Sequence, residues 1–394
     1  MKIEFSPLEG RSAQFYAFML VLLALAGAGL LATYLMYSQG LHITGMSNRV
    51  PWGISIVMAI YYIGLSAGSL VLSAMSALFG RKEFKPFARI AALLAMLLLV
   101  GALLSIILDW GKPDRVFVPF LYFNFASMFS INGILYSTYI LICFVYLLAM
   151  FAEKERLVST IALIAVIWAV AVHSGTGAIF GFVPRELYKS PLLPPSFIAA
   201  ALSSGTALMI LLLQLLFRYT RRPFDTGYVK QLSRLLAVFI IVVVYFVFVE
   251  NAFRAYLIPE RGAASYFLFG GSHSGVFWFG LIGLGIVIPA LILFSPGTKN
   301  SIKMINVAAI LHVFGVLCER YIIVIPGQKH PAEILPNMQV ESVALDGAVV
   351  NYSISFLEVI QALGIAAIVA IAFILGLRLF AMLPTKALLE DEAA

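Results

Sequence analysis

The chain has 394 residues, of which 62% are hydrophobic and 11% are charged, and its formal net charge is +7. Soluble domains are about 45–50% apolar and about 25% charged, so this composition excludes a soluble enzyme, a coiled coil and a disordered chain. Barrel strands alternate apolar and polar residues, whereas this sequence has long unbroken apolar runs, which argues against a transmembrane β-barrel. The sequence therefore predicts an all-α polytopic membrane protein.

The apolar runs define about ten transmembrane helices within a single integral membrane domain, 1–394. A helix needs about 20 apolar residues to cross a bilayer, and each run is long enough. In chain order the expected spans are 13–37, 52–79, 87–108, 126–151, 158–181, 196–217, 233–253, 275–294, 301–324 and 355–380.

The orientation follows from the basic residues at the ends of the spans. Seventeen of the 26 Lys and Arg residues fall on the side that holds both termini, and nine fall on the other side. Because Lys and Arg collect in cytoplasmic loops, both termini are expected in the cytoplasm, and the positive charge does not indicate nucleic acid. The external segments 38–51, 109–125, 182–195, 254–274 and 325–354 are longer, and long ordered loops commonly carry function or bind a partner.

Metal and cofactor chemistry has few candidate ligands in this sequence. Cys143 and Cys318 lie inside apolar runs and form no Cys-x-x-Cys motif, so neither a zinc site nor an iron–sulfur cluster is expected in this chain. His173 and His312 differ in expected depth by roughly 6 Å at 1.5 Å per residue, so one bis-His haem stays open as an alternative to a haem-free protein.

Ionisable residues within membrane spans are costly, and they are functional candidates by default. Those of this protein all fall between the middle of the membrane and its external surface: Asp109, His173, Glu250, Arg254, His312, Glu319 and Arg320. A channel or a carrier needs a polar path across the whole membrane. The one-sided distribution favours a site that opens to the external face only.

Each of these residues also has a structural explanation. Asp109 could end a helix and pair with Lys112 or Arg115. Glu250 and Arg254 have the i, i+4 spacing of an ion pair within one helix. Glu319 and Arg320, by contrast, are adjacent in sequence and are expected on different helix faces, where they cannot pair with each other. Both histidines could be buried with satisfied hydrogen bonds.

Several short motifs occur in order at the ends of the spans, and through them the chain resembles the polysulfide-reductase membrane-subunit (NrfD/PsrC) family. It is most similar to the ten-span branch that includes the DsrP-type subunit of sulfite-reductase-linked menaquinol complexes. The motifs are Pro51-Trp52-Gly53, Tyr62-Ile63-Gly64, Ser66-Ala67-Gly68-Ser69, Asp109-Trp110-Gly111-Lys112-Pro113, Asn124, His173-Ser174 and Glu319-Arg320-Tyr321.

The resemblance implies a fold, a ligand and partners. Spans 2–5 and 6–9 would form two four-helix bundles, with flanking helices beside them. A menaquinone or another quinone would bind near the external surface, next to an extrinsic iron–sulfur (ferredoxin-like) subunit. A multihaem cytochrome, a second membrane subunit and catalytic subunits are further candidate partners. Some relatives carry a His in the second span beside the Ala-Gly pair, whereas the nearest polar residue in this chain is Ser66.

The resulting hypothesis is a quinone-binding subunit of a multisubunit respiratory oxidoreductase in the cytoplasmic membrane of a prokaryote, acting within a larger complex rather than as an enzyme alone. His173 and Asp109 are the proposed catalytic proton acceptors. Trp52, Tyr62, Ser66, Arg115 and Asn124 are the proposed quinone-binding residues. Glu250, Arg254, His312, Glu319 and Arg320 form a secondary polar cluster. The alternatives are a secondary transporter and a structural membrane anchor of a redox complex.

Overall fold

The computed structural model describes residues 3–10, 12–183, 185–222, 224–258, 260–271, 273–330 and 349–385. Within these residues, ten helices are long and apolar enough to cross a membrane, and the strands are limited to two short segments. The prediction of an all-α, multi-pass integral membrane protein is confirmed.

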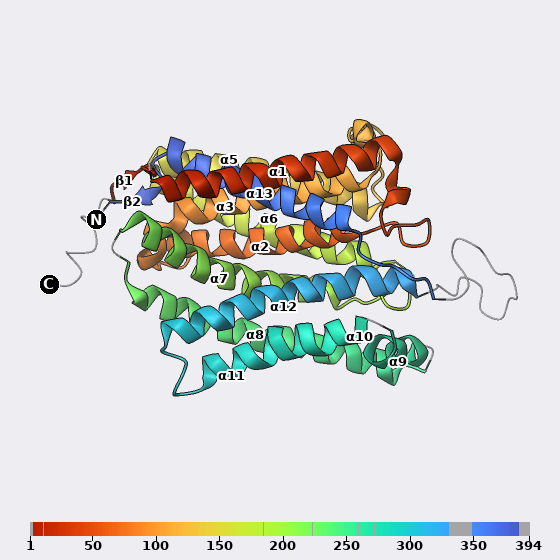
Figure 1. The fold of residues 1–394 in the computed structure, drawn as a ribbon. Coiled ribbons are helices and arrows are strands. Elements are labelled where there is room, and N and C mark those ends of the chain that lie inside the picture. The colour runs from red at the N-terminus through yellow and green to blue at the C-terminus, as the bar shows by residue number, and fades with distance from the viewer. Residues whose placement is uncertain are drawn as a thin grey trace, which may run out of the picture.

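The helices run side by side along one direction (Figure 1). The long elements are α1 (Ala13–Gln39), α2 (Ile54–Leu78), α3 (Ala88–Asp109), α5 (Met128–Phe151), α6 (Glu155–Gly181), α7 (Leu193–Thr220), α8 (Thr226–Tyr256), α12 (Ile302–Lys329) and α13 (Phe356–Leu379). A further span, His273–Phe294, consists of α10 (His273–Gly275), the π-helical η4 (Val276–Val287) and α11 (Ile288–Phe294). The short elements are β1 (Phe5–Ser6), η1 (Leu41–Ile43), η2 (Lys82–Phe87), η3 (Pro113–Arg115), α4 (Val118–Leu121), α9 (Arg261–Phe269) and β2 (Leu383–Pro384).

Each expected span coincides with one of these helical segments, but several helices are longer than the apolar runs. The run at 233–253 is the middle of α8, and the run at 301–324 belongs to a helix that continues to Lys329. Residues 325–329 are therefore helical rather than part of an external loop, and 331–348 of that loop lie outside the described residues. An apolar run ends at its first polar residues, whereas a helix continues where neighbouring helices cover those residues.

Two four-helix bundles form the body of the molecule. In the first, α2 packs on α3, α3 on α5, α5 on α6, and α6 back on α2. In the second, α7 packs on α8, α8 on α11, α11 and η4 on α12, and α12 back on α7. These bundles correspond to spans 2–5 and 6–9 of the sequence analysis.

Helix α2 joins the two bundles, because it also packs against α7 and α12. At its crossing with α7, a Cβ at Gly68 would overlap the carbonyl oxygen of Ala201 and the backbone of Gly205. Small residues allow such close backbone approach between membrane helices. Outside the bundles, α1 and α13 pack on each other, and α13 also contacts α3.

The first and last described segments of the chain meet at one end of the helical block, here called the terminal end (Figure 1). Strands β1 and β2 pair antiparallel, with Phe5 opposite Pro384. Arg222 joins them, since its guanidinium donates to the Pro384 carbonyl at 2.6 Å and to Ser6 Oγ at 2.7 Å. The opposite end, where α2 begins and α3 ends, is called the distal end.

Candidate functional site

The start of α2 at the distal end is held by a glutamine from α12. The Trp52 backbone N–H donates to Gln328 Oε1 at 2.8 Å, and Gln328 Nε2 donates to the Trp52 carbonyl at 3.0 Å. The Gln328 side chain is buried, so this two-way contact is shielded from water. It fixes the position of Trp52 relative to the second bundle.

The Trp52 side chain forms an aromatic wall with two phenylalanines. Its ring centroid lies 5.7 Å from that of Phe129 and 5.6 Å from that of Phe180, and the Phe180 ring is edge-on. Phe180 in turn contacts Tyr188 at 5.4 Å. Because Trp52 is only partly buried, this wall offers an apolar aromatic surface against which a planar ring can pack.

Asp109 is the last residue of α3, and the turn that follows it depends on a glycine. Gly111, two residues further on, has φ +66°, a conformation that favours glycine. The Asp109 side chain is 5% exposed, and its Oδ1 has no hydrogen-bond partner. The structure describes Lys112 and Arg115, and neither forms an ion pair with Asp109. The carboxylate therefore has a free acceptor atom.

His173 is buried in the first bundle between two backbone carbonyls. Its Nδ1 lies 2.8 Å from the Ala169 oxygen and its Nε2 lies 3.1 Å from the Ile63 oxygen. A neutral imidazole has one N–H, so only one contact can be a hydrogen bond unless the ring is protonated. No hydrogen bond joins His173 to Asp109 among the described residues.

The other predicted quinone-binding residues fall into two groups. Tyr62 and Ser66 are buried on α2. The Tyr62 hydroxyl has no partner, and Ser66 Oγ donates to the Ala95 carbonyl at 2.6 Å. Arg115 and Asn124 lie on the exposed segment between α3 and α5. Asn124 Oδ1 accepts the Ala126 N–H at 2.9 Å, which stabilises a turn. The structure does not bring these two groups together.

The secondary polar cluster includes one close ion pair. Arg254 and Glu250, one turn apart on α8, are 2.6 Å apart and both buried, and Arg254 also donates to the Leu187 carbonyl at 2.9 Å. The intrahelical pairing expected from their spacing is confirmed.

Glu319 and Arg320 also interact, and the expectation that they cannot was wrong. Their charged atoms are 3.7 Å apart, because long side chains on adjacent positions can bend toward each other. Arg320 is 1% exposed and lies over the Phe197 ring at 4.2 Å, while its three guanidinium nitrogens have no hydrogen-bond partner.

His312 is separate from this pair and from His173. Its Nδ1 lies 2.7 Å from the Gly285 oxygen on η4. His173 faces α2 in the first bundle, whereas His312 faces η4 in the second. The two imidazoles are therefore not arranged as a facing bis-His pair.

The sequence analysis missed Gln328, Glu358, Gln361 and His273. Gln328 lies beyond the predicted end of its span. Glu358 lies within the predicted tenth span and is fully buried, so the criterion that selected Asp109 should have selected it as well. The His273 ring is 1% exposed, and neither nitrogen has a hydrogen-bond partner.

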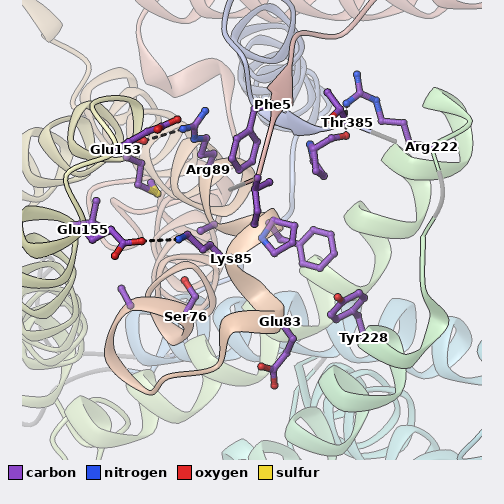
Figure 2. A pocket seen from close by; sticks show the side chains of 18 of the residues that line it. Phe5, Ser76, Glu83, Lys85, Arg89, Glu153, Glu155, Arg222, Tyr228 and Thr385 are labelled. Carbon is purple, nitrogen blue, oxygen red and sulfur yellow. Dashed lines mark hydrogen bonds and ion pairs between the residues drawn. The ribbon is translucent and has the colours of Figure 1, made fainter. Parts of the chain in front are cut away.

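A cavity of about 790 Å³ opens at the terminal end, at the opposite end of the helices from Trp52. Figure 2 shows this cavity from close by. Its wall combines aromatic rings, among them Phe5 and Tyr228, with charged side chains. Lys85 Nζ pairs with Glu155 Oε1 at 3.0 Å on one side of it. The sequence analysis placed no site at this end.

The fold defines a polytopic membrane protein of two four-helix bundles, with buried polar groups concentrated near the distal ends of its helices. Comparison with known families agrees with this class. Residues 42–332 match the family described as polysulphide reductase, NrfD, and the chain belongs to that family. The matched region covers both bundles and ends before α13.

Among curated proteins, the chain is 43% identical to the Hdr-like menaquinol oxidoreductase integral membrane subunit of Archaeoglobus fulgidus, over 99% of both proteins. It is 32% identical to a putative dimethyl sulfoxide reductase membrane subunit of Halobacterium salinarum, over 79% of this chain and 76% of that protein. It is 25% identical to the integral membrane subunit of menaquinone reductase from Nitratidesulfovibrio vulgaris, over 81% of this chain and 83% of that protein.

Proposed function

We propose that this chain is the quinone-binding membrane subunit of a respiratory oxidoreductase that exchanges electrons with the menaquinone pool. The observation that carries the proposal is the match along the full length to a menaquinol oxidoreductase membrane subunit. Two features of the distal end support the proposal. The aromatic wall at Trp52 can flank a quinone ring, and the free Oδ1 of Asp109 can accept a proton.

Quinol oxidation releases two electrons and two protons, and two residues of this protein are candidate acceptors for the protons. Asp109 is the better placed acceptor, because one of its oxygens is unpartnered while the carboxyl group is shielded from water. His173 must give up a carbonyl contact before it can take a proton from a ligand. We therefore assign Asp109 to the first proton transfer and His173 to an inner, supporting position.

The electrons require a partner in this proposal. The chain holds two cysteines, and both are buried and unpaired within apolar helices. An extrinsic iron–sulfur subunit at the distal end would accept the electrons close to the Trp52 wall. In this arrangement the terminal end faces the cytoplasm of a prokaryote. Reporter fusions after Lys299 and at the C-terminus should then report cytoplasmic, and a fusion within 333–350 should report external.

The test uses the assembled complex in native membranes and a soluble menaquinol analogue. Trp52→Leu should raise the KM for quinol because it removes one face of the ring-binding wall. Trp278→Leu is the matched control, since Trp278 is a half-exposed tryptophan of the second bundle whose Nε1 donates to the Leu268 carbonyl. Equal kinetics for wild type and both variants would contradict the distal quinone site and favour the structural-anchor alternative.

A further inference from the structure

A buried carboxylate from the last helix lies against the first turn of α2. Glu358, in the first turn of α13, is fully buried. Its Oε1 accepts the Tyr352 hydroxyl at 2.9 Å and its Oε2 accepts the Ser355 N–H at 2.8 Å. Ser355 Oγ accepts the Glu358 N–H in return, which completes a capping box. The hydrogen bonds from Tyr352 and Ser355 together hold the carboxylate in one position.

This carboxylate touches the residue that begins α2. Gly53 is the N-cap of α2 and provides no side-chain cap of its own. A Cβ at residue 53 would overlap Glu358 Oε1, so only glycine permits this approach. The amino end of a long helix carries partial positive charge, which a carboxylate complements. Glu358 thus supplies from another helix the anionic contact that the Gly53 cap lacks.

Tyr352 reinforces the contact from the segment before α13. Burial and the neighbouring Glu358 charge raise the pKa of Tyr352, so its hydroxyl stays protonated and donates a hydrogen bond to the carboxylate. Tyr352 therefore helps to hold the carboxylate against the start of α2.

A second residue of α13 extends the same contact. Gln361, three residues after Glu358, accepts the Ser55 hydroxyl at 2.7 Å and donates to Thr33 Oγ1 on α1 at 3.1 Å. From the opposite side, Gln328 of α12 holds the Trp52 backbone. The segment Trp52–Ser55 is thus fixed between α12 and α13.

We propose that Glu358 is a positioning residue of the quinone site, acting through Gly53 on the placement of the Trp52 wall. The inference rests on the proposed function and deepens it, because it assigns a role to a helix that lies beyond the family match at 42–332. The last helix, in this view, completes the site that the two bundles begin.

A displaced wall weakens quinol binding, whereas Asp109 keeps its place at the end of α3. Glu358→Ala should therefore raise the KM for the menaquinol analogue by roughly 10-fold, which corresponds to about 1.4 kcal/mol of binding, and should change kcat by less than about 2-fold. Glu358→Gln should raise KM less, since its amide oxygen can still accept the Tyr352 hydroxyl.

The sharpest test is a double-mutant cycle in the assembled complex. Gly53→Ala alone should raise KM, because the new methyl group overlaps the carboxylate. Combined with Glu358→Ala, it should add little or nothing, because the overlap is gone. Arg378→Ala is the control: Arg378 is at the other end of α13, beside Phe15, so it tests α13 stability without touching the site. Its KM should equal that of wild type.

The outcomes separate the two proposals. If the wild-type complex does not oxidise quinol, or if Trp52→Leu leaves its KM unchanged, the quinone site itself is wrong. If Trp52→Leu raises KM but Glu358→Ala does not, only the role of Glu358 is overturned, and additive effects in the cycle overturn it as well. Should Glu358→Ala fail to assemble, the KM of Glu358→Gln decides alone.

Discussion

The two bundles bury polar side chains in different ways. In the first bundle, hydroxyl groups donate to backbone carbonyls of neighbouring or own helices: Ser66 to Ala95 at 2.6 Å, Ser105 to Gly101 at 2.9 Å and Thr176 to Val172 at 2.6 Å. The His173 ring lies between two carbonyls. Most of the polar groups in this bundle therefore serve the packing of the helices.

In the second bundle and the short helix α9 beside it, several buried polar atoms have no hydrogen-bond partner among the described residues. They include all three guanidinium nitrogens of Arg320, both ring nitrogens of His273, Glu319 Oε2 and the Tyr266 hydroxyl. Buried polar groups are nearly always satisfied by protein or by ordered water. We expect internal water here. Unpartnered buried atoms are thus candidate sites for water or a ligand in both bundles, and in the first bundle they include Asp109 Oδ1 and the Tyr62 hydroxyl.

The largest effect that would test this comparison is on stability. Glu319→Gln removes the charge next to Arg320 and leaves a buried guanidinium without a counter-charge, which should cost about 3–5 kcal/mol of unfolding free energy. Unfolding of the purified protein in detergent, followed by circular dichroism, measures it. A loss below about 1 kcal/mol would show that water already compensates Arg320.

A second prediction compares the catalytic candidates across the bundles. Asp109→Asn removes the proposed proton acceptor but keeps its shape, so quinol-dependent turnover should fall by about 100-fold. His173→Ala should also lower turnover, whereas His312→Ala, a buried His held by one carbonyl of η4, should leave it near wild type. Turnover assays on complexes assembled to the same extent make the comparison. Equal losses for both histidines would contradict the assignment to the first bundle.

A third prediction concerns the contact between the bundles at the distal end. Gln328→Leu leaves the Trp52 N–H and carbonyl without their partner, and an unsatisfied buried polar group costs about 1–3 kcal/mol. We expect a loss of about 2 kcal/mol in unfolding free energy together with a higher KM. Gln214→Leu is the control, because it breaks the Gln214–Asn306 amide pair between α7 and α12 instead. It should destabilise the protein without changing KM.

The smallest effect is expected where a hydroxyl only serves packing. Ser66→Ala removes the bond to Ala95 and leaves a carbonyl that already belongs to the α3 helix, so the loss should be about 1 kcal/mol or less. Quinol turnover should equal that of wild type. A large fall in turnover would place Ser66 in the quinone site, as the sequence analysis expected.

Much of the fold could be predicted from the sequence, because apolar length alone defines a membrane helix. The candidate site was harder to predict than the fold. Asp109 was found from its position at a span end, and the Glu250–Arg254 pair was found from its spacing. Contacts such as Gln328 to Trp52 join residues far apart in sequence, and no local pattern encodes them. The Glu319–Arg320 pair was missed because the expectation considered helix faces and not the reach of the side chains.

The packing of α1 on α13 has a consequence for how this protein is made. Helix α1 is synthesised before α13, on which it packs, and only 22% of its most apolar stretch is buried in the finished fold. Helix α1 therefore lacks its main packing partner until α13 has been synthesised. Because the docking of α13 also brings Glu358 to Gly53, a nascent polypeptide cannot complete the contacts around Trp52 before α13 is inserted.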